Sequence, residues 1–371
     1  MKLEKIDEGI IFGSNAPKAG DKSGYMPFFC PMDDGRLLVA QTIGSHFDAP
    51  DSHVFLLTST DGKTFTPSEK PIANFVDEPY NITECFKVTN AGGDHVVAVG
   101  YGFIMNRGEG VGPGNAATGG LLDTPVLFQE SFDGGKTWSV TRRIPTVWGE
   151  HTEASAPIVI LPNGDYVTPI AAMPDWEGGY ASPLCGRLLR SRDGGKTWSD
   201  STVTMNFGPD TTVWEQRLCV TDTGKLVDIA WVENLRTGTL YNNRIAVSTD
   251  NGETFGEPID TGVHGQASCV CPLKGDRILT IHSMRKDVDR YGVKVCIANL
   301  ENGFEIEDSF YAWEPNFAMK KVEGMNEVFS MMRFGQPSMV RLDDGTFLYC
   351  QWLMENDVCR TIWQKYRLTE E

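Results

Sequence analysis

Polar and ionisable side chains recur at the starts of successive strand-like segments, where an apolar pattern would otherwise begin. They comprise carboxylates, imidazoles, amides, guanidinium groups and one indole, at Glu84, His151, Glu153, Trp214, Glu215, Arg217, His264, Gln266, Arg333 and Gln336. If the fold brings these segment starts to one point, the side chains form a site for a polar ligand. A sugar suits such a site, because its hydroxyl groups need many hydrogen-bond donors and acceptors.

The elements that must position these residues are six hairpin-like units. Each unit has a tight polar turn between two apolar runs, and the turn glycines are Gly35, Gly93, Gly164, Gly224, Gly275 and Gly345. These glycines lie 58, 71, 60, 51 and 70 residues apart. Asx-Gly and similar turns between apolar runs are typical of β-hairpins. A hairpin repeated about every 60 residues predicts a repeat architecture made of strands.

A second repeat runs alongside the first. The pattern Ser-x-Asp-x-Gly-x-Thr-Trp/Phe occurs four times, at residues 59–65, 131–138, 191–198 and 248–255, and the first copy is one residue shorter. The Asp carboxylate can accept hydrogen bonds from backbone N–H groups that follow it, and Gly can adopt the positive φ of the turn. The first four units each end in one of these turns, which indicates that each unit contains a second hairpin.

This second motif is the Asp-box, and nearly the whole chain resembles the sialidase-like, Asp-box (BNR-repeat) family of β-propellers. The resemblance implies an all-β fold, a six-bladed β-propeller of four-stranded antiparallel blades. Residues 1–371 would form a single domain, in which the N-terminal strand at residues 5–12 closes the last blade. The alternative architecture is a β-solenoid of separate hairpins.

In such a blade the short turns emerge on one face and the longer connections on the other. We expect the connections at residues 102–124, 174–184, 232–243 and 305–333 to be long loops. Long loops on a rigid scaffold commonly carry function. The site should therefore lie at the axis, on the face opposite the short turns.

The resemblance also suggests roles for individual carboxylates. Glycoside hydrolysis needs two carboxyl groups beside the bond, one protonated and one ionised. Asp51, in the loop at residues 47–53, matches the placement of the family's acid/base Asp, and Asp48 is a near rival. Glu215 resembles the Glu that activates the family's tyrosine nucleophile. Glu153 and Glu84 stand at equivalent positions in their blades, and His151, His264 and His53 are candidate proton carriers.

The chain departs from the sialidase pattern at several positions. Tyr25 stands where the family has the first of three carboxylate-binding arginines, and Trp231 lies where the second is expected. Arg290 matches the third. Gln336 lies where the nucleophilic tyrosine should stand. Other arginines could rebuild an anion site from different loops, namely Arg107, Arg217, Arg285 and Arg333. Trp148, Trp176, Trp214 and Trp231 could either stack on sugars or fill the spaces between blades.

We therefore expect an exo-acting glycoside hydrolase of sialidase-like architecture that removes a terminal sugar, acidic or neutral, from small oligosaccharides. The mechanism would use two carboxylates, and not the family's tyrosine nucleophile. One alternative is a uronate-type polysaccharide lyase with His151 or His264 as base. The other is a carbohydrate-binding propeller without catalytic activity. Because fold does not fix function, the site must decide between these classes.

Composition excludes several other classes. The net charge of −17 and pI of about 4.8 argue against nucleic-acid binding. The nine cysteines lie mostly in apolar runs, which predicts reduced core residues. They have no zinc-site spacing and no P-loop is present, so neither a metal nor another cofactor is expected. The N-terminus lacks the apolar stretch of a signal peptide, and no run of 18 apolar residues exists, so we expect a cytoplasmic protein without a membrane span.

Overall fold

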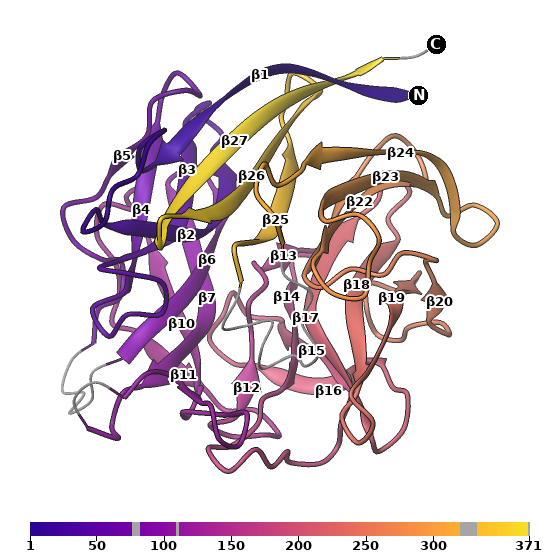
Figure 1. The fold of residues 1–371 in the computed structure, drawn as a ribbon. Helices are drawn as coiled ribbons and strands as arrows, with labels where there is room; N and C mark the ends of the chain where they lie inside the picture. The colour runs from indigo at the N-terminus through magenta and orange to yellow at the C-terminus, as the bar shows by residue number, and fades with distance from the viewer. Residues whose placement is uncertain (76–81, 109–110, 320–331, 370–371) are drawn as a thin grey trace.

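Strands form all the regular secondary structure in the computed structural model, which describes residues 1–75, 82–108, 111–319 and 332–369. Six sheets are arranged in a ring, like the blades of a propeller, as Figure 1 shows. These ranges contain no apolar helix of the length needed to cross a bilayer.

The first three blades follow the chain in order. Blade 1 contains β2 (Ser23–Pro31), β3 (Leu37–Gly44), β4 (His53–Ser59) and β5 (Thr66–Pro67). Blade 2 contains β6 (Ile82–Gly92), β7 (His95–Ile104), β10 (Val126–Ser131) and β11 (Arg142–Ile144). Blade 3 contains β14 (Tyr166–Ala172), β15 (Gly186–Ser191) and β16 (Ser199–Met205), and its innermost position is shared by the short strands β12 (Thr152–Glu153) and β13 (Val159–Ile160).

The second half of the ring repeats this order. Blade 4 contains β17 (Thr211–Val220), β18 (Leu226–Asn234), β19 (Thr239–Ser248) and β20 (Ile259–Asp260). Blade 5 contains β21 (Ser268–Pro272), β22 (Arg277–Met284), β23 (Gly292–Asn299) and β24 (Glu305–Trp313). Blade 6 contains β25 (Phe334–Arg341), β26 (Thr346–Glu355), β27 (Val358–Thr369) and β1 (Lys2–Phe12). The predicted six-bladed, four-stranded antiparallel propeller is confirmed.

The two ends of the chain share one blade. β1 pairs antiparallel with β27, from Lys2 opposite Thr369 to Phe12 opposite Thr361, and Figure 1 shows both termini beside each other. Blade 6 is then joined to blade 1 by side chains. The Thr361 hydroxyl donates to the Gln41 amide oxygen at 2.8 Å, and the Cys359 N–H donates to the Ser23 hydroxyl at 3.0 Å. The ring is therefore held closed by hydrogen bonds between residues more than 300 positions apart.

The core lies between neighbouring sheets, because successive side chains of a strand point to opposite faces. On β7, Val96 and Ala98 pack towards blade 1 while Val97 and Val99 pack towards blade 3, and all four are fully buried. A strand buried on both faces is apolar along its length, which explains why the expected strands appear as continuous apolar runs. The nine cysteines are all buried and free.

The Asp-box turns are stabilised by their own carboxylates. Asp133 Oδ1 accepts hydrogen bonds from Lys136 N–H at 3.0 Å and Thr137 N–H at 2.9 Å, and Oδ2 accepts from the Thr137 hydroxyl at 2.6 Å. Asp193 and Asp250 make the corresponding bonds to Thr197 and Thr254. These hydrogen bonds lower the pKa of each of the three carboxyl groups to about 2.

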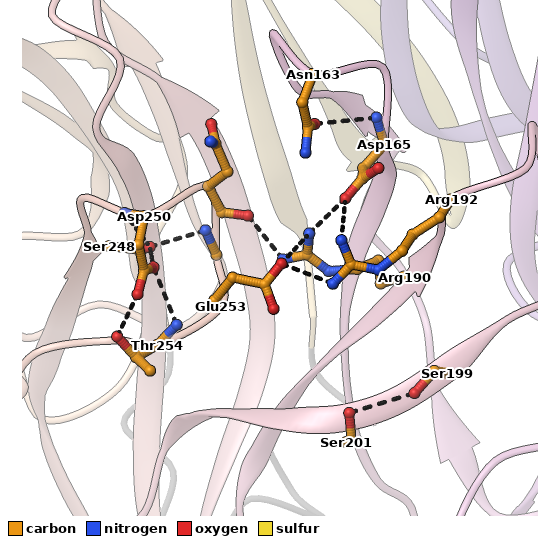
Figure 2. Close-up of polar contacts among 12 residues, drawn as sticks. Asn163, Asp165, Arg190, Arg192, Ser199, Ser201, Ser248, Asp250, Glu253 and Thr254 are labelled. Atoms are coloured by element: carbon orange, nitrogen blue, oxygen red, sulfur yellow. Dashed lines mark hydrogen bonds and ion pairs between the residues drawn. The ribbon is translucent and has the colours of Figure 1, made fainter.

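The same turns fasten each blade to the one before it. A Cβ atom added to Gly195 would lie 2.5 Å from Cζ of Phe128, and Trp198 meets Phe128 edge-on at 5.5 Å. Figure 2 shows a polar counterpart between blades 3 and 4. There Asp165 binds Arg190 at 2.6 Å and Arg192 at 3.2 Å, and Arg192 reaches Glu253 of the next Asp-box at 2.6 Å.

Two of the segments predicted to be long loops contain strands. β18 and β19 meet in a tight turn in which Gly238 N–H donates to Asn234 C=O at 2.8 Å, so the prediction of a long loop at residues 232–243 is wrong. Residues 305–313 form β24, the outer strand of blade 5, and residues 320–331 of the predicted loop lie outside the described residues. Most residues of β24 are exposed or half-buried, and the sequence pattern did not separate such a polar outer strand from a loop.

We expect Gly195→Ala to destabilise the fold by about 3 kcal/mol, because it combines a left-handed backbone with a clash against Phe128. Gly194→Ala is the matched control. Its φ is also positive but nothing lies within 4 Å of the added Cβ, so it should cost only about 1 kcal/mol. Urea unfolding of both variants measures the difference. Equal losses would show that the glycine is needed only for its backbone conformation.

The lowered pKa values of Asp133, Asp193 and Asp250 predict acid lability. A carboxyl group whose folded pKa lies below its unfolded value stabilises the fold above the unfolded pKa, near 3.8, and loses that contribution as pH falls through the folded pKa, about 2. Thermal midpoints should therefore fall between pH 4 and 2. The fall should be smaller in Asp250→Asn than in Asp289→Asn, a control at an exposed residue. Identical slopes in the two variants would contradict this assignment.

Candidate active site

Three innermost strands carry the same irregularity where they approach the axis. The register between the first two strands of blades 1, 4 and 6 shifts between Tyr25 and Phe28, between Trp214 and Arg217, and between Gly335 and Ser338. The bulged residues are Met26, Glu215 and Gln336, with φ of 56°, 45° and 42°. A left-handed backbone is costly for residues with side chains, and such conformations concentrate at functional sites.

The bulges bring residues of distant blades into contact. Glu215 of blade 4 accepts a hydrogen bond from Gln336 Nε2 of blade 6 at 2.9 Å and another from Trp231 Nε1 at 2.9 Å. Each carboxylate oxygen has one donor, so the group is fixed in orientation. Met26 of blade 1 contacts the Cys85 thiol of blade 2 at 3.6 Å. The bulged residues of blades 4 and 6 are therefore in direct contact, and that of blade 1 contacts blade 2.

A small pocket, partly open to solvent, lies on this face between blades 1 and 2. Its lining includes Tyr25, Asp48, Glu84, Cys85, Tyr101 and Phe103. Asp48 has a left-handed backbone with φ of 56°, and its N–H donates to the Tyr25 hydroxyl at 3.2 Å. The residue is exposed at the pocket mouth, yet the surrounding walls remove much of the water that would hydrate its carboxyl group. This desolvation raises the pKa of Asp48 to about 6, and His46 offsets only part of it.

Tyr101 of β7 connects the pocket to the axial carboxylates. Burial raises the pKa of its hydroxyl, and the negative charges of Glu153, Glu215 and Asp48 raise it further. All three acidic side chains thus lie within electrostatic range of one buried phenol. They come from blades 3, 4 and 1, so the arrangement places acidic groups on several sides of the same space.

Three buried charged residues lie on the innermost strands of blades 2, 3 and 4. Glu153 accepts from Ser155 N–H at 2.8 Å; burial raises its pKa, and Arg217 offsets part of that rise. Arg217 donates to the Ser155 hydroxyl at 2.9 Å and the Gln216 carbonyl at 2.8 Å. Lys87 donates to the Met26 carbonyl at 2.7 Å, and burial lowers its pKa. Within the described ranges no carboxylate lies within 4.0 Å of Lys87 or Arg217. Neither positive charge is therefore neutralised by a salt bridge there.

Glu84 and His53 form a pair at the edge of the pocket. His53 Nδ1 lies 3.0 Å from Glu84 Oε2, and Glu84 Oε1 accepts from Val54 N–H at 2.9 Å. The hydrogen bond and charge of Glu84 raise the pKa of His53, although burial opposes the shift. Glu84, predicted to bind substrate, is therefore first of all the partner of a histidine.

Several other predicted residues have partners in their own loop or in a neighbouring segment of the same blade. Asp51 accepts from Ser45 N–H at 3.0 Å and from the Ser45 hydroxyl at 2.8 Å, and the backbone hydrogen bond holds its pKa below the usual value. Arg290 makes two 2.6 Å hydrogen bonds to Glu314 on the exposed rim. Gln266 accepts from the N–H groups of Arg285 and Lys286 at 3.2 and 3.0 Å.

Arg333 and Arg107 also lie outside the central cluster. Arg333 donates to the Met354 sulfur at 3.0 Å and lies 3.9 Å from Asp357, both in blade 6. Arg107 lies over the Trp176 ring at 4.7 Å, between the connections of blades 2 and 3. By contrast, Arg285 is buried, donates weakly to Phe334 C=O at 3.4 Å, and lies within electrostatic range of Glu215.

The remaining predicted site residues are Trp214, His151 and His264. Trp214 stacks on Trp231 at 5.6 Å and donates its indole N–H to Glu233 at 3.0 Å. His151 Nδ1 and His264 Nε2 are buried, and neither has a hydrogen-bond partner within the described part of the chain. Trp148 packs in the core between blades 2 and 3.

Sequence reasoning did not identify Tyr101 or Glu233 as site residues. Tyr101 lies opposite Cys85 in the register of β6 and β7, and Glu233 lies opposite Thr212 in blade 4. Both therefore stand at the end of a second strand, opposite the start of the innermost strand. A search for polar residues at the end of the second strand of each unit would have identified both. No group of three or more potential metal ligands occurs in the residues that the structure describes.

Comparison with known proteins agrees with the repeats and the fold. The family profile of the BNR/Asp-box repeat matches residues 129–140 and 189–200. Similar solved structures include a protein of unknown function from Dyadobacter fermentans, with 20% identity, a TM-score of 0.72 and coverage of 99% of both chains. Among curated proteins, no sequence matches this chain.

Other similar structures are sialidases. The Hadza microbial sialidase Hz136 has 14% identity and a TM-score of 0.63, over 93% of this chain and 66% of the sialidase. Trypanosoma rangeli sialidase in complex with sialic acid has 14% identity and a TM-score of 0.63, over 98% of this chain and 58% of the sialidase. The chain thus spans two thirds or less of these enzymes. At such identities the likeness shows the propeller fold and leaves the chemistry to the residues of the site.

We expect Glu84→Gln to lower the pKa of His53 towards its ordinary value of 6.5, because the charged partner is lost while the amide oxygen can still accept from Val54. A raised histidine pKa stabilises the fold below the unfolded pKa, and the contribution is lost as pH rises through the folded pKa. The variant should thus lose stability at pH 5 and little at pH 9. NMR titration of His53 measures the pKa, with Glu69→Gln as an exposed control. An unchanged titration would contradict the pairing.

Proposed function

We propose that the protein is an exo-acting glycoside hydrolase in which Asp48 is the general acid and Glu215 is the second carboxylate. The observation that carries the proposal is the contrast between two carboxyl groups that both lie within electrostatic range of Tyr101. Desolvation of the Asp48 carboxyl group raises its pKa to about 6, whereas the Glu215 carboxylate is held in place by hydrogen bonds from Trp231 and Gln336. Two carboxyl groups in contrasting environments are what acid and base roles in glycoside cleavage require.

Asp48 suits the acid role better than Asp51, three residues later. A general acid must hold a proton near neutral pH and be able to reach the substrate. Asp48 meets the first condition up to about pH 6 through its raised pKa, and the second through its place in the pocket lining. Asp51 has a lowered pKa and accepts two hydrogen bonds from Ser45, so it serves the conformation of the loop.

The surroundings of Glu215 favour a direct role for this carboxylate. Gln336 occupies the place where the sialidase resemblance puts a tyrosine, and an amide cannot act as the nucleophile. The Tyr25 hydroxyl accepts a hydrogen bond from the Asp48 N–H, and burial raises the pKa of Tyr25. In the proposed reaction, Asp48 protonates the glycosidic oxygen while Glu215 either attacks the anomeric carbon or activates a water. Carboxyl separations of about 5–5.5 Å favour retention, and about 6.5–9.5 Å favour inversion.

The contact between two connections favours exo action. The short hairpin of β8 (Gly114–Asn115) and β9 (Gly120–Leu121) lies against the blade 3 connection. Asn115 Nδ2 and the Thr118 hydroxyl both donate to the Trp176 carbonyl, at 3.0 and 2.7 Å. If these joined connections border the site, the end of a small oligosaccharide would enter it more easily than a long polysaccharide would.

We expect Asp48→Asn and Glu215→Gln each to lower kcat by at least about 100-fold on activated and natural glycosides. Asp51→Asn should keep activity within about threefold of wild type, once its stability is matched. Because the acid must be protonated, kcat/KM of the wild type should decrease above about pH 6, and Asp48→Asn should lose this limb. A screen of aryl glycosides and uronic-acid oligosaccharides provides the assay.

The screen also separates the competing functions. An unsaturated product that absorbs in the near ultraviolet would indicate a lyase. Binding without turnover in the wild type would indicate a carbohydrate-binding protein. Full activity in Glu215→Gln would remove this residue from the mechanism.

A further inference from the structure

A second group of polar residues lies beside the catalytic pair, on the wall made by blades 4 and 5. Trp214 is half-buried, stacks on Trp231 at 5.6 Å, and meets Tyr180 edge-on at 6.1 Å. The two indoles donate to different carboxylates, Trp231 to Glu215 and Trp214 to Glu233. The indole pair therefore links Glu215 directly to a second acidic group, which the proposed mechanism does not use.

Polar atoms on this wall lack partners in the free protein. His264 is half-buried, and its Nε2 atom is buried without a hydrogen-bond partner in the described ranges. Burial lowers the pKa of His264, so the imidazole is neutral at neutral pH and can either donate to or accept from a hydroxyl group. Gln336 Oε1 is likewise buried and unpaired, next to Glu215. A buried polar atom without a partner costs free energy that a bound hydroxyl group can recover.

The charges on the wall favour a neutral ligand over an acidic one. Glu215 and Glu233 are both hydrogen-bond acceptors, and Lys286, within electrostatic range of Glu233 and His264, already binds the carboxylate of Asp287. Arg285 has no carboxylate partner within the described ranges, but it is only 5% exposed, so a ligand at the surface of this wall meets Glu215 and Glu233 first. A neutral ligand therefore suits these two acidic side chains better than a carboxylate does.

We propose that Trp214, Glu233 and His264 form a subsite for the hydroxyl-bearing edge of a neutral pyranose, the edge away from the bond that is cleaved. Trp214 provides the apolar surface for the ring, while Glu233 and His264 bind its hydroxyl groups. This deepens the proposed function, because it assigns a neutral terminal sugar to the pocket. The subsite rests on the proposed hydrolase function in one respect, namely that the sugar ring lies between Asp48 and Glu215.

Direct binding tests the subsite without any need for turnover. The probes are the methyl glycosides of glucose, galactose and mannose, together with the methyl uronides of glucose and galactose, titrated by NMR. The wild type should bind at least one neutral glycoside more tightly than its uronide. Glu233→Gln and His264→Ala should each weaken that binding about tenfold. Glu257→Gln, at an exposed residue on the outside of blade 4, is the matched control and should bind like the wild type.

Thermal midpoints identify any variant that fails to fold, and Glu233→Gln keeps an acceptor for the Trp214 N–H, so at least this variant should remain folded. The subsite would be overturned by any of three results: a uronide binds more tightly than its neutral glycoside, no probe binds, or Glu233→Gln leaves the affinity unchanged. Neutral-sugar binding that depends on Glu233 but occurs without turnover of any glycoside would uphold the subsite and contradict the hydrolase.

Discussion

The site depends on a backbone conformation that is unfavourable where it occurs. Met26, Glu215 and Gln336 adopt positive φ at matching bulges in blades 1, 4 and 6. Each such residue costs of the order of 1–3 kcal/mol and persists only where its surroundings determine the conformation. Here the surroundings are long antiparallel strands buried on both faces, closed into a ring by β1 and β27. In these three blades the buried strands thus support a strained end of the innermost strand, and that end carries Glu215 and Gln336.

Environment gives chemically similar residues different roles. Asp48 and Asp51 lie in one loop, yet one faces the walls of a pocket and the other binds the backbone of Ser45. Among the described arginines, Arg290 is paired on the rim, whereas Arg217 and Arg285 are buried near the axis. Glu215 and Glu233 accept hydrogen bonds from the two indoles of one stacked pair, so the proposed catalytic carboxylate and the proposed sugar subsite adjoin each other. The proposed function follows from these contrasts, and the fold shared with sialidases supplies only the frame.

Local sequence predicted the features whose causes are local. The Asp-box carboxylates bind N–H groups within four residues, and the turn glycines have the expected positive φ, so the six-bladed fold followed from their spacing. The innermost-strand starts also predicted Glu215 and Gln336 as site residues, and the structure shows that these two side chains are hydrogen-bonded. The roles of Asp51, Gln266 and Arg290 could not be predicted, because their partners depend on loop conformation or on a neighbouring strand. Tyr101 was missed because its importance comes from carboxylates of three other blades.

A crystal structure of the Glu215→Gln variant with a bound oligosaccharide tests the central claim most directly. The account predicts that the terminal sugar lies on the axial face, with the Asp48 carboxyl group within hydrogen-bond distance of the glycosidic oxygen and residue 215 on the other side of the ring. A sugar bound on the face of the short turns, or bound at the axis with Asp48 directed away from the glycosidic oxygen, would contradict it.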